Sequence, residues 1–319
     1  MYLWLALIFI VGSISVKELD ILFAKCNGID IREITIAQAH RHYRIGRLTP
    51  WQLTACYLER IRKLDGSLFS VLEINSHAEE EAAKVRKGPL YGIPVLVNVN
   101  MHVRGMDNID GLFFRGFKPK HEALAIQRLR AQGAVILGKT NLSKISGLIV
   151  PLRNQGIWQY PDYPKNPYNL TRTMYGLSSG SAVAVAANLA MAALGTETDG
   201  TLINPSLMTS LYGFKPSLTR GMLDGMIPIA PSMDTFGVIA RTAEDCAIIT
   251  YAIANPRGAT RHRLKVIFIT FPHYIEIPHR HPQRKSILKF LSSPRNKPPG
   301  LYSPKQPVSY DPITFQAFN

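Results

Sequence analysis

Apolar side chains recur at helical spacing in the first half of the chain. Thr49 and Pro50 suit the N-cap and first turn of a helix that runs through Lys63, and its apolar positions are Leu53, Tyr57, Leu58, Ile61 and Leu64. Residues 122–132 predict a second amphipathic helix, which ends at Gly133 and places on one side Ala125, Ile126 and Leu129. An apolar stripe on an otherwise polar helix indicates that these helices cover a sheet.

Short apolar runs between these helices predict strands. Residues 70–74 are suited to one strand, and residues 92–97 form a nearly unbroken apolar run that is typical of a strand buried on both faces. Pro94 indicates either the beginning of that strand or a place at the sheet edge. Residues 134–137 predict the next strand, and the order strand, helix, strand predicts a parallel pairing.

Two further segments are predicted to be helical. Ser76 and Glu79 could form a capping box for a charged surface helix that extends to Arg86. Residues 178–194 are rich in alanine, and they predict a helix buried in a soluble core through small side chains, with Gly195 at its end.

The composition is that of a globular protein followed by an unusual tail. The 319 residues are 46% apolar and 18% charged, which allows a sizeable core in one large domain or two ordinary ones. The net charge of +15 is unevenly spread, because residues 255–319 contain 11 Lys and Arg against 2 acidic residues, and 10 of the 22 prolines. We therefore predict that residues 255–319 form a basic, proline-rich, disordered tail.

The tail is open to two interpretations. It could be a basic arm for nucleic acid or an anionic membrane, or the frame-shifted or intron-derived end of a truncated gene copy. The second interpretation is favoured, so nucleic acid is not the expected partner.

The N-terminal residues predict a secretory signal. Residues 1–11 are all apolar, and Gly12, Ser13 and Ser15 follow, which suggests cleavage after Ser15. The run is too short to predict a membrane span. The domains expected are thus residues 1–15 as signal, 16–254 as body and 255–319 as tail. A wrongly assigned start, or a helix docked on the body, is the alternative, and it would leave the protein in the cytoplasm.

Other motifs are sparse. Three cysteines, Cys26, Cys56 and Cys246, are too few and too scattered for a disulfide framework or a zinc site. Two glycosylation sequons begin at Asn141 and Asn169, and they matter only in a secreted chain. The sequence contains no phosphate loop or dinucleotide fingerprint, so neither a cofactor nor a metal is expected.

Three stretches together resemble the amidase signature family of serine hydrolases, most closely its peptide-amidase-like branch. They are residues 88–100, residues 166–205, and residues 213–217 with 225–245. The similarity extends over about residues 29–254. It implies an α/β fold with a mixed, largely parallel sheet flanked by helices, whose C-terminal part is missing here. It also implies a small amide or peptide amide as ligand.

The resemblance implies a specific chemistry. Members of the family hydrolyse an amide with a serine nucleophile, a second serine on a cis peptide that relays protons, and a neutral lysine as base. The attacking hydroxyl must lose a proton and the leaving amine must gain one, so proton carriers are needed beside the nucleophile. The turn before the nucleophile, matched here by Thr198, Asp199 and Gly200, would direct backbone N–H groups at the developing oxyanion.

All three catalytic positions are substituted in this chain. Asn98 stands where the lysine would be, Leu177 where the relay serine would be, and Thr201 where the nucleophile would be. The spacing between them shows no insertion or deletion relative to the peptide-amidase-like branch. Threonine retains a hydroxyl, but asparagine does not accept a proton near neutral pH and leucine relays none. The sequence therefore predicts a catalytically degenerate amidase.

Two alternatives remain open. The first is a weakly active amidase with Thr201 as nucleophile, and the second is binding of nucleic acid or membrane through the tail. No neighbouring residue restores the triad: His102 is too far along the chain, Lys139 is better explained as structural, and Ser178 would need a one-residue shift.

Overall fold

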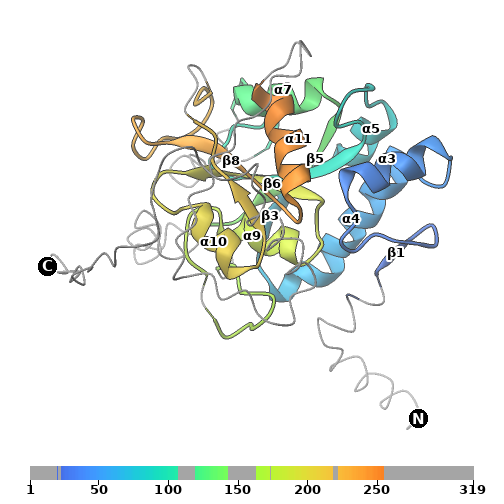
Figure 1. Cartoon of the computed structure of the whole chain (residues 1–319), viewed down its shortest axis with the longest axis horizontal. Helices are drawn as coiled ribbons and strands as arrows, with labels where there is room; N and C mark the ends of the chain where they lie inside the picture. The colour runs from blue at the N-terminus through green and yellow to red at the C-terminus, as the bar shows by residue number, and fades with distance from the viewer. Residues whose placement is uncertain are drawn as a thin grey trace, which may run out of the picture. The chain divides into compact units, whose positions relative to one another are not determined.

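The computed structural model describes residues 20, 23–106, 119–142, 163–172, 174–217 and 222–254 (Figure 1). The chain divides into two units, residues 1–260 and 261–319, and all the described residues belong to the first. The predicted signal and the predicted tail lie outside the described residues.

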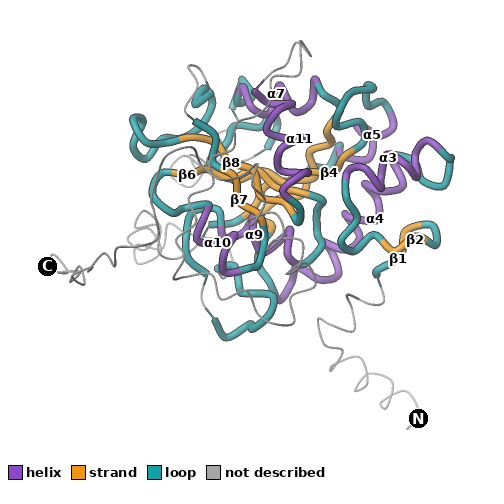
Figure 2. The backbone as a smooth tube through the Cα atoms, viewed as in Figure 1, coloured by secondary structure: helices purple, strands orange, loops and turns teal. Residues whose placement is uncertain are grey.

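A six-stranded sheet forms the centre of the described body, with helices around it (Figure 2). The strand order is β3-β5-β4-β6-β8-β7. The pairings β5–β4 and β4–β6 are parallel and the outer three are antiparallel, so β4, β5, β6 and β7 run in one direction. The predicted mixed sheet flanked by helices is confirmed. The strands are β3 (Val71–Ile74), β4 (Ile93–Asn98), β5 (Ala134–Thr140), β6 (Ala192–Glu197), β7 (Tyr212–Phe214) and β8 (Thr235–Ala240).

Helices pack on this sheet and on one another. α4 contacts β4 and β5, α9 contacts β4 and β6 at the centre of the sheet, and α11 packs on β8 and α7. A separate hairpin of β1 (Lys25–Cys26) and β2 (Ile29–Asp30) contacts α4. The helices are α3 (Ile36–Arg44), α4 (Pro50–Leu64), the 3-10 turn η2 (Asp65–Ser67), α5 (Ala78–Ala83), α7 (Leu124–Ala131), α9 (Ser179–Ala186), α10 (Ile203–Met208) and α11 (Ala243–Ala254).

The helix caps and apolar patterns that depend on neighbouring residues predicted several elements correctly. α4 begins with the predicted N-cap, where Thr49 and Gln52 form a capping box, and all five of its predicted apolar positions are buried. The strand and helix predicted at residues 70–74 and 122–132 are present as β3 and α7. Pro94 is the second residue of β4 and precedes its first pairing with β6, so the interpretation as a strand beginning is correct and the edge interpretation is wrong.

The helix predicted at residues 178–194 ends early, and this prediction is wrong beyond Ala186. Asn188 adopts a left-handed φ of 55°, which turns the chain back, and the alanine-rich sequence continues as β6 between β4 and β8. Met191 N–H donates to Pro94 O at 3.2 Å and so starts this strand pairing. Alanine by itself favours a helix, so the pairing of β6 with β4 and β8 overrides that local preference here.

The capping box predicted at Ser76 is also wrong. α5 spans only Ala78–Ala83, and its first residue is preceded by His77 without a side-chain cap. Asn75 organises this turn instead, because its Oδ1 accepts from His77 N–H at 3.0 Å and its carbonyl accepts from Ala78 N–H at 3.1 Å.

A disulfide that the cysteine count did not predict joins Cys26 of β1 to Cys56 of α4, with their Cα atoms 5.9 Å apart. It links the N-terminal hairpin to the main body. Three cysteines argue against a framework of several bridges, but they do not exclude a single bridge.

The C-terminal end of α9 is satisfied by two buried arginines. The last carbonyls of a helix have no partner within it, and they carry the negative end of its dipole. Arg60 of α4 and Arg241, which follows β8, donate at 2.7 to 3.2 Å to carbonyls of the last turn of α9, of its C-cap and of the segment that follows. The acceptors are the carbonyl oxygens of Val185, Ala187, Asn188 and Ala190. Arg60 also pairs with Asp20.

We predict that Arg60→Ala lowers the free energy of unfolding by about 3–5 kcal/mol, because it leaves buried carbonyls without donors. Arg62→Ala is the matched control, since Arg62 lies on the same helix but is exposed. It should change the free energy by no more than about 0.5 kcal/mol. Urea unfolding of the full chain measures both, and equal stability of the two variants would contradict the role of Arg60.

Candidate active site

The fold brings the three substituted positions together. Asn98 is the last residue of β4, Leu177 precedes α9, and Thr201 follows β6. β4 and β6 are parallel neighbours, so their carboxyl ends meet at one edge of the sheet, where ligand sites of such sheets lie. Asn98 Nδ2 donates to Leu177 O at 2.9 Å, across 79 residues of sequence, and Ser178 N–H donates to Thr201 O at 3.0 Å.

The Asn98 side chain connects β4 to the beginning of α9. It is fully buried, and both ends of its amide are occupied: Nδ2 donates to Leu177 O, and Oδ1 accepts from Asn100 N–H at 3.1 Å. A neutral amide with both ends bonded holds the backbone in place but takes up no proton.

Leu177 fills an apolar cluster. Its side chain is 3% exposed and packs with Val99 and Leu142. A proton relay needs a polar atom at this position, and leucine offers none. The described residues contain no cis peptide bond.

The neighbouring Ser178 hydroxyl is occupied by the backbone of β6. It donates to Thr196 O at 3.1 Å and accepts from Thr196 N–H at 3.0 Å. Its geometry fastens the beginning of α9 to β6, so it is not directed towards Thr201 as a relay would be.

The Thr201 hydroxyl closes its own turn. Its Oγ1 donates to Thr196 O at 2.8 Å and accepts from Thr198 N–H at 3.0 Å. The Thr201 hydroxyl therefore donates its hydrogen bond to a backbone carbonyl. Among the described residues, no side-chain base accepts from this hydroxyl.

Glu197 binds the backbone of the predicted oxyanion turn. Its carboxylate accepts from the Gly200 N–H, and from those of Leu202 and Ile203 at 2.7 and 2.9 Å. Gly200 adopts a φ of 79°, which suits glycine and lets the turn wrap around the carboxylate. With the Thr198 N–H bound to Thr201, two N–H groups of the turn of Thr198, Asp199 and Gly200 already have acceptors.

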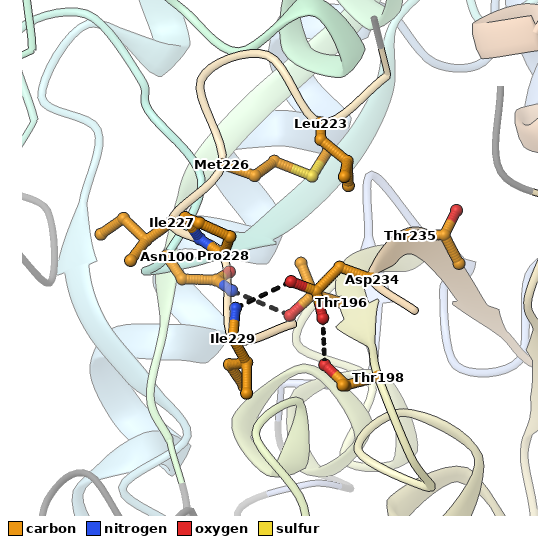
Figure 3. A pocket seen from close by; sticks show the side chains of 10 residues that line it. All are labelled: Asn100, Thr196, Thr198, Leu223, Met226, Ile227, Pro228, Ile229, Asp234 and Thr235. Atoms are coloured by element: carbon orange, nitrogen blue, oxygen red, sulfur yellow. Dashed lines mark hydrogen bonds between the residues drawn. The ribbon is translucent and has the colours of Figure 1, made fainter. Parts of the chain in front are cut away.

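A small cavity lies beside this turn (Figure 3). The cavity volume is about 10 Å³, which is room for about one water molecule. Asp234 closes one side, because its carboxylate accepts from the Thr198 hydroxyl at 2.5 Å and from the Ile229 N–H at 2.7 Å. The lining residues are Asn100, Thr196, Thr198, Leu223, Met226, Ile227, Pro228, Ile229, Asp234 and Thr235, and they include none of the three substituted positions.

Lys139 and His102 both make hydrogen bonds that hold the backbone in place. Lys139 is fully buried, and its ammonium donates to the carbonyls of Met101 and, at 3.4 Å, Val99, which holds the chain after β4. The backbone of His102 is held by the carbonyl of Gly225, which accepts from its N–H at 2.8 Å. Neither contact directs a base at Thr201.

Two acidic residues that organise this region, Glu197 and Asp234, are not predicted by the sequence patterns described above. Each one lies at the end or the beginning of a buried strand and is itself buried. An acidic residue directly at a strand end, next to a glycine turn, is the signal that could have identified Glu197.

Within the described ranges, no group of three or more His, Cys, Asp or Glu side chains is placed to hold a metal ion. None of the helices in those ranges is long and apolar enough to cross a membrane.

A family model described as Amidase matches residues 52–284 of the chain. The chain belongs to the amidase family. It is 36% identical over 262 residues to a probable amidase of Arabidopsis thaliana, a match that covers 78% of this chain and 50% of that protein.

Solved amidase structures have a similar fold. The native peptide amidase of Stenotrophomonas maltophilia is 36% identical with a TM-score of 0.59, and the match covers 72% of this chain and 51% of that one. An amidase family protein from Bacillus anthracis is 30% identical with a TM-score of 0.63, covering 76% and 50%. The chain thus spans about half the length of the amidase relatives it matches.

We predict that Thr201→Val lowers the free energy of unfolding by about 1–3 kcal/mol, since it leaves the Thr198 N–H without its acceptor and removes one of the two hydroxyl donors to the Thr196 carbonyl. Thr201→Ser retains the hydroxyl, so its free energy of unfolding should decrease much less. Urea unfolding compares the two variants. A Val variant as stable as the Ser variant would contradict a structural role for the hydroxyl.

Proposed function

We propose that this protein is a catalytically degenerate amidase, which retains the family's fold but hydrolyses no amide at a useful rate. The observation that carries the proposal is the Asn98 amide bonded to Leu177 O and Asn100 N–H at the position of the expected base. Attack on an amide requires that the nucleophile's proton passes to a base and then to the leaving amine. Nothing at Asn98 or Leu177 can carry that proton.

The surroundings of Thr201 support the same proposal. Its hydroxyl donates to Thr196 O, so attack on a substrate would first have to break a bond within the turn. The neighbouring cavity has room for about one water molecule, whereas small-molecule sites usually occupy about 300–1,000 Å³. A small amide or peptide amide, the ligand expected from the family, would need this region to open.

The family reaction also supplies the test, because the substitutions can be reversed. Turnover of a peptide amide and a small aliphatic amide is measured for the full chain, for Thr201→Ala, and for the combined variant N98K/L177S/T201S. We expect the natural chain to be no faster than Thr201→Ala, since loss of catalytic-unit members lowers rates by about four to six orders of magnitude.

Labelling by a fluorophosphonate provides a second measurement. The combined variant should react faster than the natural chain, and N98K/L177S/T201A is its matched control because it restores the base and relay without a hydroxyl at the nucleophile position. If the natural chain shows turnover that Thr201→Ala abolishes, degeneracy is refuted and the weakly active amidase with a threonine nucleophile is correct.

We also propose that the protein passes through the secretory pathway. The apolar segment at residues 1–15 motivates this, and the Cys26–Cys56 disulfide supports it, because disulfides persist in oxidising compartments and are rare in the cytosol. The third cysteine, Cys246, is buried and unpaired, and burial raises the pKa of its thiol to about 12, so it is a poor partner for exchange.

We predict that one thiol per chain reacts with a thiol reagent when the full protein, produced in eukaryotic cells with its own N-terminus, is unfolded without reductant. After reduction, three should react, since the chain has 3 cysteines. Cys246→Ala is the control and should leave no reactive thiol before reduction. Three reactive thiols without reduction would contradict an oxidising compartment.

A further inference from the structure

The chain contains two N-glycosylation sequons, Asn141-Leu142-Ser143 and Asn169-Leu170-Thr171. The sequence does not distinguish them, because each has the required Asn-x-Ser/Thr pattern without proline at the middle position. The structure separates them by the surroundings of the asparagine.

Asn141 lies inside the body, where a glycan cannot fit. Asn141 is 1% exposed, and its Nδ2 donates to Phe69 O at 2.8 Å. The backbone of α9 packs directly on it, since Gly180 N–H donates to Asn141 O at 3.2 Å. A sugar on Nδ2 would have to enter a close-packed interior.

Asn169 lies on an exposed turn formed by residues 166–172. The turn is closed by backbone bonds from Asn169 N–H to Asn166 O at 3.1 Å and from Arg172 N–H to Asn169 O at 3.0 Å. Asn169, Leu170 and Thr171 are all exposed. A glycan on this turn would extend into solvent without displacing any packed side chain.

The two side chains of this sequon already contact each other. Asn169 Oδ1 accepts from the Thr171 N–H at 3.0 Å and from the Thr171 hydroxyl at 2.7 Å. These bonds leave Nδ2, the atom that would carry the sugar, without a hydrogen-bond acceptor among the described residues. The native turn is therefore compatible with modification at Nδ2 and loses no bond by it.

We propose that Asn169 is an N-glycosylation site of this protein and that Asn141 is not. The donor is an oligosaccharide linked through C1 to a polyprenyl diphosphate. Nδ2 forms a bond to C1 and loses one proton, while the C1–O bond breaks and the diphosphate leaves with the electron pair. The inference rests on the proposed passage through the secretory pathway.

The position of Asn169 gives the glycan a physical consequence. Its neighbours Tyr168 and Leu170 are 66% and 40% exposed, which is high for large apolar side chains. Tyr168 also donates its hydroxyl to Thr209 O at 3.0 Å, so it lies against the end of α10. A hydrophilic glycan at Asn169 would shield this apolar surface and increase solubility.

Peptide mapping tests the proposal on the natural sequence. The full chain is produced in eukaryotic cells in two forms, one with its own N-terminus and one with a supplied signal sequence. Trypsin releases residues 166–172 and 140–144 as separate peptides, because Lys165, Arg172, Lys139 and Lys144 flank them. After enzymatic deglycosylation, which converts a glycosylated Asn to Asp, we expect the conversion at Asn169 and an unchanged Asn141.

Variants give an independent measurement. Asn169→Gln and Thr171→Ala should each abolish the electrophoretic shift that deglycosylation produces, whereas Thr171→Ser and Asn141→Gln should retain it. The proposal is overturned if the secreted chain has an unmodified peptide 166–172, or if Asn141 is occupied in folded protein. Modification only with the supplied signal would support the Asn169 assignment and contradict the secretory proposal.

Discussion

The packing of α9 in the centre of the body is the constraint on which the rest of the structure depends. Its small side chains allow it to lie close against β4 and β6, where a helix with larger side chains would not fit. A helix buried in this way cannot expose its last carbonyls to water, so the chain must supply donors from elsewhere. Arg60 donates to the carbonyl of the C-cap residue Ala187 and Arg241 to that of Val185. They come from positions far apart in the sequence, and they thereby tie α4 and the segment after β8 to the same helix end.

The opposite end of α9 carries the candidate active site, and it is held by the same kind of bond. Asn98 binds the carbonyl of Leu177, Ser178 binds both polar groups of Thr196, and Thr201 closes the next turn. Each of these polar side chains therefore has a backbone partner. At these positions the side chains make structural hydrogen bonds that connect β4, β6 and α9. The proposed loss of the reaction is therefore compatible with membership of the amidase family.

Electrostatics at the turn follow the same principle. Glu197 is buried, and its carboxylate is stabilised by three N–H groups from Gly200, Leu202 and Ile203. Asp234 fastens the facing loop in a similar way through Thr198 and Ile229. Two buried acids therefore organise the backbone around a cavity of about one water molecule, and they leave little room for a ligand in this conformation.

Features that depend only on nearby residues could be predicted from the amino-acid sequence. The cap at Thr49, the apolar positions of α4, and the strands at residues 70–74 and 92–97 were readable because caps and periodicity are local. The residue types at positions 98, 177 and 201, on which the proposal of degeneracy rests, were also readable. Tertiary structure alone decided that α9 ends at Ala186, that Cys26 meets Cys56, that Glu197 occupies the turn, and that Asn141 is buried while Asn169 is exposed. These outcomes depend on contacts between segments that are distant in the sequence, and the local pattern of residues does not predict which segments will be in contact.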